Sequence, residues 1–336
     1  MAQCRYGAAR PLPACLQSLL LRTGREARTD ARTHFERVFL SNSGAEANEC
    51  LIKTARKWAS DTKGEGEHPF VTLVNSFHGR TLTTVAATGQ DTFHKFFGPF
   101  TPGFRYVPAG DLAALERQLD AEDCSAVLVE IVQGEGGVRA LDADYLKAVE
   151  ALCHEKNVLF CVDEVQTGNG RTGTWFAYEQ FGLSPDLVST AKGLGNGLPI
   201  GATLMGSKTA EVLTPGTHGS TFGGNPVACA GALSVLEQID DAFLEAVKQK
   251  GAWLTAELEK IPGVKDVSGL GLMLGFSVEG CKSADIKAKA LDNGLVVLTA
   301  KDRVRLLPPL AITEEELSDG LLRLAAAIRE VQEAAH

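Results

Sequence analysis

The sequence predicts an α/β protein with a mostly parallel central sheet flanked by helices, followed by a smaller α+β domain at the C-terminus. Apolar runs of strand length alternate with helical patterns, which is typical of parallel strands joined by right-handed crossovers. The run Val158–Val162 ends in Asp163, and Leu187–Val188 leads to Lys192, so both strands deliver a polar side chain to one sheet edge. Beyond Asp241 the order changes to helix, strands, helix, short strands and a terminal helix.

The first part of the predicted sheet follows from β-branched apolar runs and from helical spacing. A helix after residue 43 has apolar side chains at Leu51, Ile52, Ala55 and Trp58, which share one face. Strands are expected at Arg37–Leu40, Phe70–Val74, Phe104–Val107 and Val127–Val132, and further helices at Leu112–Leu119 and Ala143–Glu155. We expect a large domain over residues 37–240.

The C-terminal part begins after a glycine-rich loop that leads to a long helix with Pro226 in its first turn. Strands are expected at Val264–Val267 and Leu272–Val278. A later strand carries Arg305 and is ended by Pro308–Pro309, since proline cannot donate to a sheet ladder. We expect a small C-terminal domain over residues 241–336.

The N-terminal stretch differs from the rest of the chain. Residues 1–37 hold seven arginines and three acids, a local charge of 7 − 3 = +4 in a chain whose net charge is −9. An arginine-rich leader is typical of an organelle transit peptide. Glu26, Asp30 and Glu36 interrupt that pattern, so residues 1–36 are interpreted as an atypical, disordered or aberrant N-terminus.

The composition excludes several classes of protein. The net charge of −9 argues against a nucleic-acid or membrane-surface partner. No apolar run approaches the roughly 20 residues that span a bilayer. The eight cysteines form no CxxC pair, so we expect reduced thiols, no metal site and a cytoplasmic location.

Asp163 and Lys192 are the candidate reactive pair, because the ends of adjacent strands border a cleft in an open α/β sheet. An acid and a lysine in such a cleft favour carbonyl chemistry through a lysine imine. The alternatives are a loop-capping acid and a solvated surface lysine. Gly168–Gly173 also satisfies a dinucleotide fingerprint, but the aromatic segment Trp175–Tyr178 follows it where a helix should begin, so its glycines are expected to form tight turns.

Two further segments place polar groups at strand ends. Ser43 follows a strand and precedes a helix, and free N–H groups at such a helix start favour a phosphate, although a simple N-cap is the alternative. A second loop brings together Phe77, His78 and Arg80, and another strand closes on Glu130.

Seven segments together resemble the class III aminotransferases, pyridoxal-phosphate enzymes of fold type I. The resemblance extends from about residue 37 to the end, and the pattern is most similar to that of the acetylornithine aminotransferases. The segments are Ser43–Glu49, Phe77–Thr81, Gln133–Gly137, Asp163–Gly168, Ala191–Gly193, Ser220–Pro226 and Arg305–Pro309.

This resemblance implies that the cofactor is pyridoxal 5'-phosphate. Lys192 is expected to hold it as an imine and to move the proton, and Asp163 to pair with the ring nitrogen. The remaining cofactor-binding residues implied are Ser43, Gly44 and Ala45 at the phosphate, Phe77 and Val165 on the ring faces, Gln166 near the ring hydroxyl, His78, Glu130, and Thr221 from a partner subunit.

The resemblance also implies the substrates. Arg305 is expected to clamp the α-carboxylate of glutamate and Glu135 to pair with this arginine when an amine-ended substrate binds. Arg80 is expected at the far carboxylate of acetylornithine, and Ser220 is a further substrate-binding residue. The implied reaction converts N2-acetylornithine and 2-oxoglutarate to N-acetylglutamate 5-semialdehyde and glutamate, in arginine biosynthesis.

Family members are dimers with composite active sites, so a homodimer is implied. Two alternatives stay open. Ornithine and 4-aminobutyrate aminotransferases share Lys192, Asp163 and Arg305. The second alternative is an inactive homologue, because relatives carry a longer region before the phosphate-binding turn than this chain does.

Overall fold

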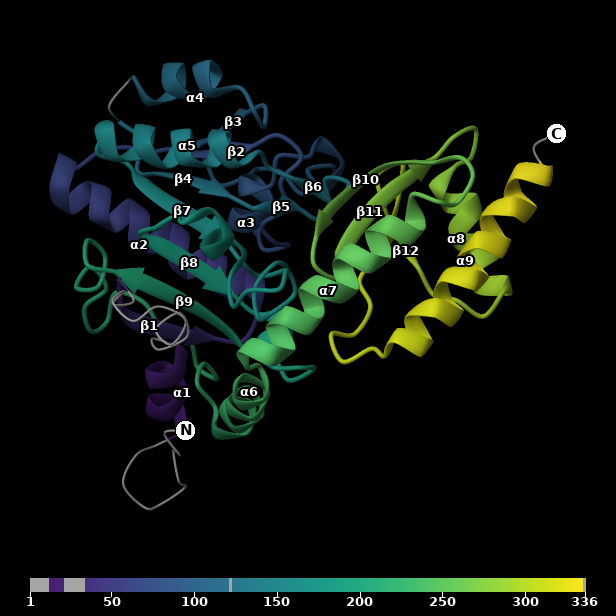
Figure 1. The fold of residues 1–336 in the computed structure, drawn as a ribbon. Helices are drawn as coiled ribbons and strands as arrows, with labels where there is room; N and C mark the ends of the chain where they lie inside the picture. The colour runs from purple at the N-terminus through teal and green to yellow at the C-terminus, as the bar shows by residue number, and fades with distance from the viewer. Residues whose placement is uncertain (1–11, 21–33, 121–122, 335–336) are drawn as a thin grey trace.

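The computed structural model describes residues 12–20, 34–120 and 123–334. Within them, a large sheet lies between layers of helices, and a smaller sheet with its own helices follows toward the C-terminus (Figure 1). This arrangement confirms the predicted fold class. The interpretation of residues 1–36 as atypical falls mainly on residues 1–11 and 21–33, which lie outside the described part of the chain.

The central sheet is parallel except for one strand. β9 pairs antiparallel with both β1 and β8, and the other pairings are parallel. The strand order is β1 (Phe35–Ser41), β9 (Gly201–Gly206), β8 (Leu187–Thr190), β7 (Leu159–Asp163), β4 (Ala126–Val129), β2 (Phe70–Leu73) and β3 (Phe104–Val107). The sequence did not predict β9, because it is short, bounded by glycines and buried on both faces, which leaves no alternation to detect.

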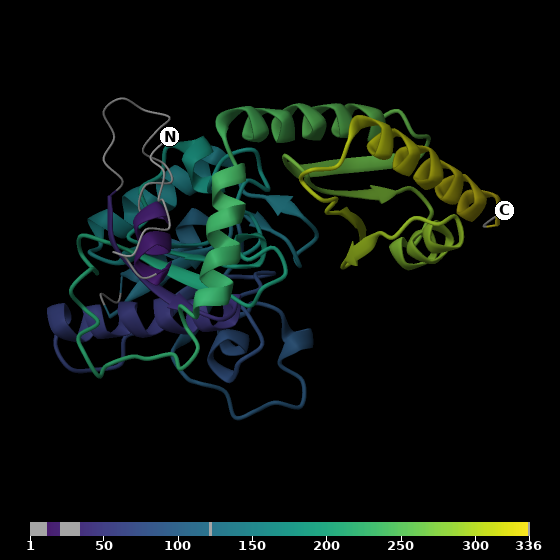
Figure 2. The same cartoon turned by 90° about the horizontal axis from the view of Figure 1, so that it is seen from below.

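Alternate residues of the central strands pack on opposite faces of the sheet. In β7, Phe160 and Val162 join one hydrophobic cluster, and Leu159 and Cys161 join another. Figure 2 shows α2 on the side of the sheet opposite α5. The helices around this sheet are α2 (Gly44–Lys63), α3 (Leu82–Ala87), α4 (Leu112–Leu119), α5 (Ala143–Glu155) and α6 (Pro226–Gln238).

The smaller sheet is antiparallel and has a separate core. Its order is β10 (Val264–Leu270), β11 (Met273–Val278), β13 (Arg303–Leu306) and β12 (Leu298–Ala300). The helices that belong to it are α7 (Asp241–Leu258), α8 (Ser283–Asp292) and α9 (Glu314–Ala334). Leu254, Phe276, Val304 and Leu324 are among its buried side chains.

A short hairpin and three single turns complete the described elements. The hairpin pairs β5 (Val132–Gln133) with β6 (Arg139–Ala140), so the strand expected at Val127–Val132 is broken after Val129. The 3-10 turns are η1 (Asp91–Phe93), η2 (Ala177–Phe181) and η3 (Lys192–Leu194). The hairpin packs against the smaller sheet through Val132, Val138 and Met273.

The structure begins earlier than Arg37, where the first ordered residue was expected. Helix α1 (Leu12–Leu20) lies against the main sheet and α6 (Figure 1). Leu16 and Leu20 are buried in the main core, and Gln17 Nε2 donates to the Val38 carbonyl at 3.0 Å. The apolar run in the N-terminal stretch is therefore a core-facing helix.

The glycines of Gly168–Gly173 form turns, as expected. Gly170 and Gly173 have φ angles of 86° and 92°, which favour glycine. Arg171, between them, donates to the carbonyls of Leu272 and Pro308 at 3.0 and 2.6 Å. The turn therefore ties the main sheet to the smaller one.

In the ranges 12–20, 34–120 and 123–334, no helix has both the length and the apolar character that crossing a membrane requires.

Glu164, which follows Asp163, points into the turn region and is fully buried. Its carboxylate accepts from the Thr167 hydroxyl and, at 2.9 Å, from the Tyr178 N–H. Burial raises the pKa of Glu164 from 4.5 to about 7, although these donors oppose the rise. The native state therefore binds a proton here more tightly than the unfolded chain does.

This difference predicts a pH-dependent stability. A raised pKa in the native state means that the free energy of unfolding falls as pH rises from 4.5 to about 7 and then levels off. Glu164→Gln should make this decline less steep, since an amide does not titrate, while Glu130 and Glu179, whose pKa values burial also raises, keep their contributions. Urea unfolding measured from pH 4 to pH 8 checks it, with exposed Glu65→Gln as the control. An equally steep decline in both variants would contradict the assignment.

Candidate active site

The centre of the candidate site is Asp163, the last residue of the central strand β7. Its side chain is 4% exposed. Oδ2 accepts from Asn48 Nδ2 at 2.7 Å and from His78 Nδ1 at 2.9 Å, and Oδ1 accepts from the Val165 N–H at 3.0 Å. A buried carboxylate is costly unless it is hydrogen-bonded, so these donors hold it in one orientation.

Asn48 is a site residue to which the sequence analysis assigned no role. It lies on α2, is 1% exposed, and its Nδ2 also donates to the His78 carbonyl at 2.8 Å. Its amide therefore joins α2, β7 and the loop after β2. Its position within the segment Ser43–Glu49 could have indicated a role in the site. Helical spacing alone, however, predicts only that Asn48 faces the core.

Lys192 lies just past the end of β8, beside β7. Asp163 and Ser189 are register partners, and Lys192 follows Ser189 by three residues. Its side chain is exposed, and its φ of 45° is unusual for a residue with a Cβ. Asn169 Nδ2 holds the preceding backbone by donating to Thr190 Oγ1 at 2.9 Å and to the Ala191 carbonyl at 3.0 Å.

Glu130 connects Asp163 and Lys192 electrostatically. It is 4% exposed, and its carboxyl accepts from the Phe77 N–H at 2.9 Å. Burial raises the pKa of Glu130 well above its ordinary range, the charge of Asp163 adds to the rise, and the charge of Lys192 opposes it. The charges of Asp163 and Lys192 therefore both act on the Glu130 carboxyl at the sheet edge.

The start of α2 forms a second part of the site. Ser43 is the N-cap and accepts from the Glu46 N–H at 3.2 Å, so the simple capping interpretation holds. The first turn still leaves backbone N–H groups at Gly44 and Ala45 with no carbonyl in the helix to receive them. A Cβ on Gly44 would lie 2.5 Å from Val165 Cγ1, so only glycine fits against that side chain.

Gln166, next to Val165, lies against the hairpin loop. A Cβ on Gly134 would be 2.4 Å from both Gln166 Oε1 and Nε2. Gln166 Oε1 and His78 Nε2 are buried, and each has no hydrogen-bond partner among the described residues. Buried polar atoms without partners are expected where a bound group completes the site.

The aromatic and cationic side chains after β2 stack on one another. The Arg80 guanidinium lies 5.4 Å from the Phe77 ring centre and 4.3 Å from that of Phe93. The two rings meet edge to face at 5.3 Å. Arg80 is exposed, so its charge faces solvent, and Phe93 in η1 is a contact that no sequence pattern indicated.

Arg305 and Glu135 form an ion pair between the smaller sheet and the hairpin loop. Arg305 Nη1 lies 2.6 Å from Glu135 Oε1, and the two side chains are 9% and 30% exposed. Arg305 Nε is buried without a partner among the described residues. The guanidinium therefore keeps unused donor capacity beside an exchangeable carboxylate.

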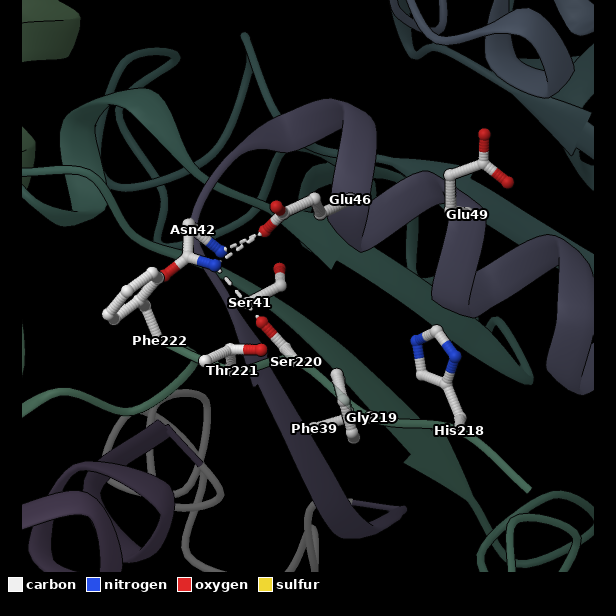
Figure 3. Close-up of a pocket in the computed structure, with 10 residues that line it drawn as sticks. All are labelled: Phe39, Ser41, Asn42, Glu46, Glu49, His218, Gly219, Ser220, Thr221 and Phe222. Atoms are coloured by element: carbon white, nitrogen blue, oxygen red, sulfur yellow. Dashed lines mark hydrogen bonds between the residues drawn. The ribbon is translucent and has the colours of Figure 1, made fainter. Parts of the chain in front are cut away.

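The loop with Ser220 and Thr221 lies against the start of α2 in the same chain (Figure 3). Asn42 Nδ2 donates to Ser220 Oγ at 3.0 Å and to Glu46 Oε2 at 2.9 Å. A hollow of about 360 Å³ lies here, and its lining includes Ser220 and Thr221 but not Asp163 or Lys192. The expected contribution of Thr221 from a partner subunit concerns a second chain and stays a prediction.

The site groups a buried acid, an accessible amine, helix-start N–H groups and a paired arginine. In the described part of the chain, no group of three or more His, Cys, Asp or Glu side chains could hold a metal ion. The set fits a flat, phosphorylated, protonated aromatic aldehyde, with Gly44 leaving room at the phosphate end.

Comparison with known proteins identifies the family. Residues 13–328 match the family described as Aminotransferase class-III. A protein from Haemophilus ducreyi named acetylornithine aminotransferase is 51% identical over 88% of this chain and 76% of its own. One of the same name from Bacillus subtilis is 48% identical over 87% of this chain and 75% of its own.

Solved structures agree with the fold. Ornithine aminotransferase from Toxoplasma gondii, in a structure reporting partial occupancy of PLP, has a TM-score of 0.85 and 34% identity over 98% of this chain and 84% of its own. N-acetylornithine aminotransferase from Stenotrophomonas maltophilia has a TM-score of 0.82 and 36% identity over 97% and 82%. The chain belongs to the class III aminotransferases and is a transaminase whose cofactor is pyridoxal 5'-phosphate.

Proposed function

We propose that this chain transfers the amino group of N2-acetylornithine to 2-oxoglutarate, giving N-acetylglutamate 5-semialdehyde and glutamate in arginine biosynthesis. The observation that carries the proposal is the ion pair between Arg305 and Glu135 at 2.6 Å. An enzyme that alternates between an amine-ended donor and a dicarboxylate needs an arginine that is paired with an acid of the protein when the donor binds and is free to bind a carboxylate when the dicarboxylate binds. The relatives named acetylornithine aminotransferase, 44–51% identical, support this choice of donor.

Lys192 and Asp163 are the proposed catalytic residues. When bound, pyridoxal phosphate supplies an aldehyde that accepts the amino group and a ring that withdraws electrons from the substrate carbon. Lys192 Nζ would hold the cofactor covalently at rest and, once released, would move the proton at the substrate carbon. Asp163, fixed by Asn48 and His78, keeps a proton on the ring nitrogen.

The other proposed cofactor contacts are those implied by the resemblance to the family, and the site geometry supports them. The N–H groups of Gly44 and Ala45, with the Ser43 hydroxyl, bind the phosphate at the positive end of α2. Phe77 and Val165 cover the two ring faces. The remaining contacts proposed are Gln166 at the ring hydroxyl, His78 and Glu130 behind the ring, and Thr221 of the partner subunit at the phosphate.

Carboxylate recognition divides between two arginines. Arg305 binds the α-carboxylate of glutamate or 2-oxoglutarate through a planar two-point pairing, and Glu135 returns to it when the donor is bound. Arg80, held over aromatic rings, binds the carboxylate of acetylornithine, with Ser220 near the substrate mouth. We also propose a PLP-binding domain over 37–240, a small domain over 241–336 and a cytoplasmic location.

Donor choice is the experiment that tests the function. With 2-oxoglutarate as acceptor, kcat/KM for acetylornithine should exceed that for the other two donors by at least about 10-fold, which corresponds to about 1.4 kcal/mol. Ornithine carries a charged α-ammonium where acetylornithine has a neutral amide, and 4-aminobutyrate has no acetamido group and a carboxylate one carbon nearer the amine. Glutamate formation measures all three rates. A preference for ornithine or 4-aminobutyrate would assign a different class III activity, and loss of all three would indicate an inactive homologue.

Lys192→Ala should abolish covalent attachment of the cofactor and reduce turnover by several orders of magnitude, because no other amine replaces it. Borohydride reduction followed by intact-mass measurement should add the cofactor to the wild type and not to the variant. Lys260→Ala, which removes an exposed lysine paired with Glu257, is the matched control. Substantial catalysis by Lys192→Ala would rule out the mechanism.

A homodimer with composite sites predicts complementation between defective subunits. Thr221→Ala and Lys192→Ala remove groups that would come from different subunits to one site. Mixed dimers then contain one site with both defects and one with neither. Activity should therefore reappear when the two variants are unfolded, mixed and refolded together. Sedimentation should report about twice the chain mass of 35.7 kDa. A monomer, or no recovery on mixing, would contradict the composite site.

A further inference from the structure

The loop that carries Glu135 is held in a strained conformation. Val138, at the end of this loop, has a φ of 54° although its side chain is β-branched, and it is fully buried. Such a backbone persists only where surrounding contacts over-determine it, and these positions gather at functional sites. The contacts that hold Val138 therefore bear on where Glu135 lies.

Packing from the smaller sheet is the first of these contacts. Val138 clusters with Val132 and Met273. A Cβ on Gly275 of β11 would lie 2.7 Å from Val138 Cβ and 3.0 Å from the Gly137 carbonyl oxygen, so the strand and the loop touch backbone to backbone. β11 holds the loop with no space between them.

A hydrogen-bond chain from β10 is the second contact. Ser268 Oγ donates to the Val138 carbonyl at 2.6 Å. Arg303 Nη2 donates to Ser268 Oγ at 3.0 Å and also to the carbonyls of Asp266 and Gly275. Because Arg303 fills the acceptor side of the Ser268 hydroxyl, the one hydroxyl proton is directed to Val138.

The orientation of the Ser268 side chain comes from an irregularity in the pairing of β10. The register between β10 and β11 shifts between Lys265 and Ser268, and Asp266 in that interval has a φ of 55°. A bulge of this kind turns the following side chain, and bulges are frequent next to active sites.

The same strands hold the arginine that Glu135 covers. Gly275, which packs on the loop, is the register partner of Arg305 in the β11–β13 ladder. Arg303, the fully buried end of the hydrogen-bond chain, is two residues from Arg305 on β13. The loop and the arginine are therefore fixed to one frame, and the distance between their side chains depends on the contacts of Ser268.

We propose that Ser268 and Arg303 are positioning residues that seat Glu135 on Arg305, and so determine how strongly this site rejects a carboxylate. The inference rests on the proposed function, in which Arg305 serves the dicarboxylate substrate. Glu135 and a substrate carboxylate compete for one guanidinium. Without the hydrogen bond from Ser268, Glu135 pairs with Arg305 less often. Carboxylates then bind to Arg305 more easily, and the amine-ended donor more often meets an unpaired arginine.

Ser268→Ala tests the proposal through binding as well as turnover. Glutarate serves as probe, because it has two carboxylates and no amino or keto group to react. Calorimetry on the cofactor-loaded enzyme should show glutarate bound about fivefold more tightly in the variant, as expected for losing one hydrogen bond that favours the competing Glu135. The KM for acetylornithine should rise by a similar factor with kcat little changed.

Matched variants separate this role from a general structural one. Ser268→Thr keeps the hydroxyl and should behave as wild type. Ser318→Ala is the control, because it removes a serine hydroxyl of α9 that donates within its own helix, to the Glu314 carbonyl at 2.7 Å. In a Glu135→Gln background the competing charge is already gone, so Ser268→Ala should add no further gain in glutarate affinity.

Two outcomes overturn the proposal by itself: unchanged glutarate affinity in Ser268→Ala, or an equal gain in the Glu135→Gln background. Arg305→Lys supplies the separate check on the proposed function, because it should weaken glutarate binding by about 10-fold or more. Unweakened binding in Arg305→Lys would overturn the proposed carboxylate site and, with it, the positioning role that rests on that site.

Discussion

The buried carboxylate of Asp163 is the constraint on which the site depends. At 4% exposure it is stable only because Asn48, His78 and the Val165 N–H donate to it. Those donors belong to α2, to the loop after β2 and to the turn after β7. Each of these segments also carries another residue of the candidate site, so satisfying one acid fixes the relative positions of the start of α2, the loop with Phe77 and the end of β7.

A second constraint joins the two sheets. Arg305 belongs to the smaller sheet and Glu135 to a hairpin of the larger part, so their ion pair crosses between layers with different cores. Arg171 adds a second link, because its guanidinium donates to the uncharged carbonyls of Leu272 and Pro308. The proposed substrate-binding pair therefore lies where the layers meet, while the proposed cofactor contacts of Asp163 and Lys192 lie within the main sheet.

The sequence predicted the parts of the site that local pattern encodes. Asp163 and Lys192 were placed correctly at neighbouring strand ends, because apolar runs that stop at a polar residue mark the edge of a parallel sheet. Strand β9 was missed, since a short run buried on both faces shows no alternation. Asn48 and Ser268 were given no role, because their importance lies in partners more than 100 residues away, at Asp163 and at Val138.

Backbone strain distinguishes positions whose conformation depends on contacts distant in sequence from positions that local sequence pattern predicts. Lys192 and Val138 both adopt positive φ, at 45° and 54°, and neither side chain favours that region. Local propensity predicts the opposite backbone for each, so the conformation must come from contacts distant in sequence. Asn169 provides them before Lys192, and Ser268 with Gly275 provides them at Val138. Lys192 and the loop of Glu135 are thus held by residues whose own sequence context is ordinary, which is why motifs alone do not reveal these supporting residues.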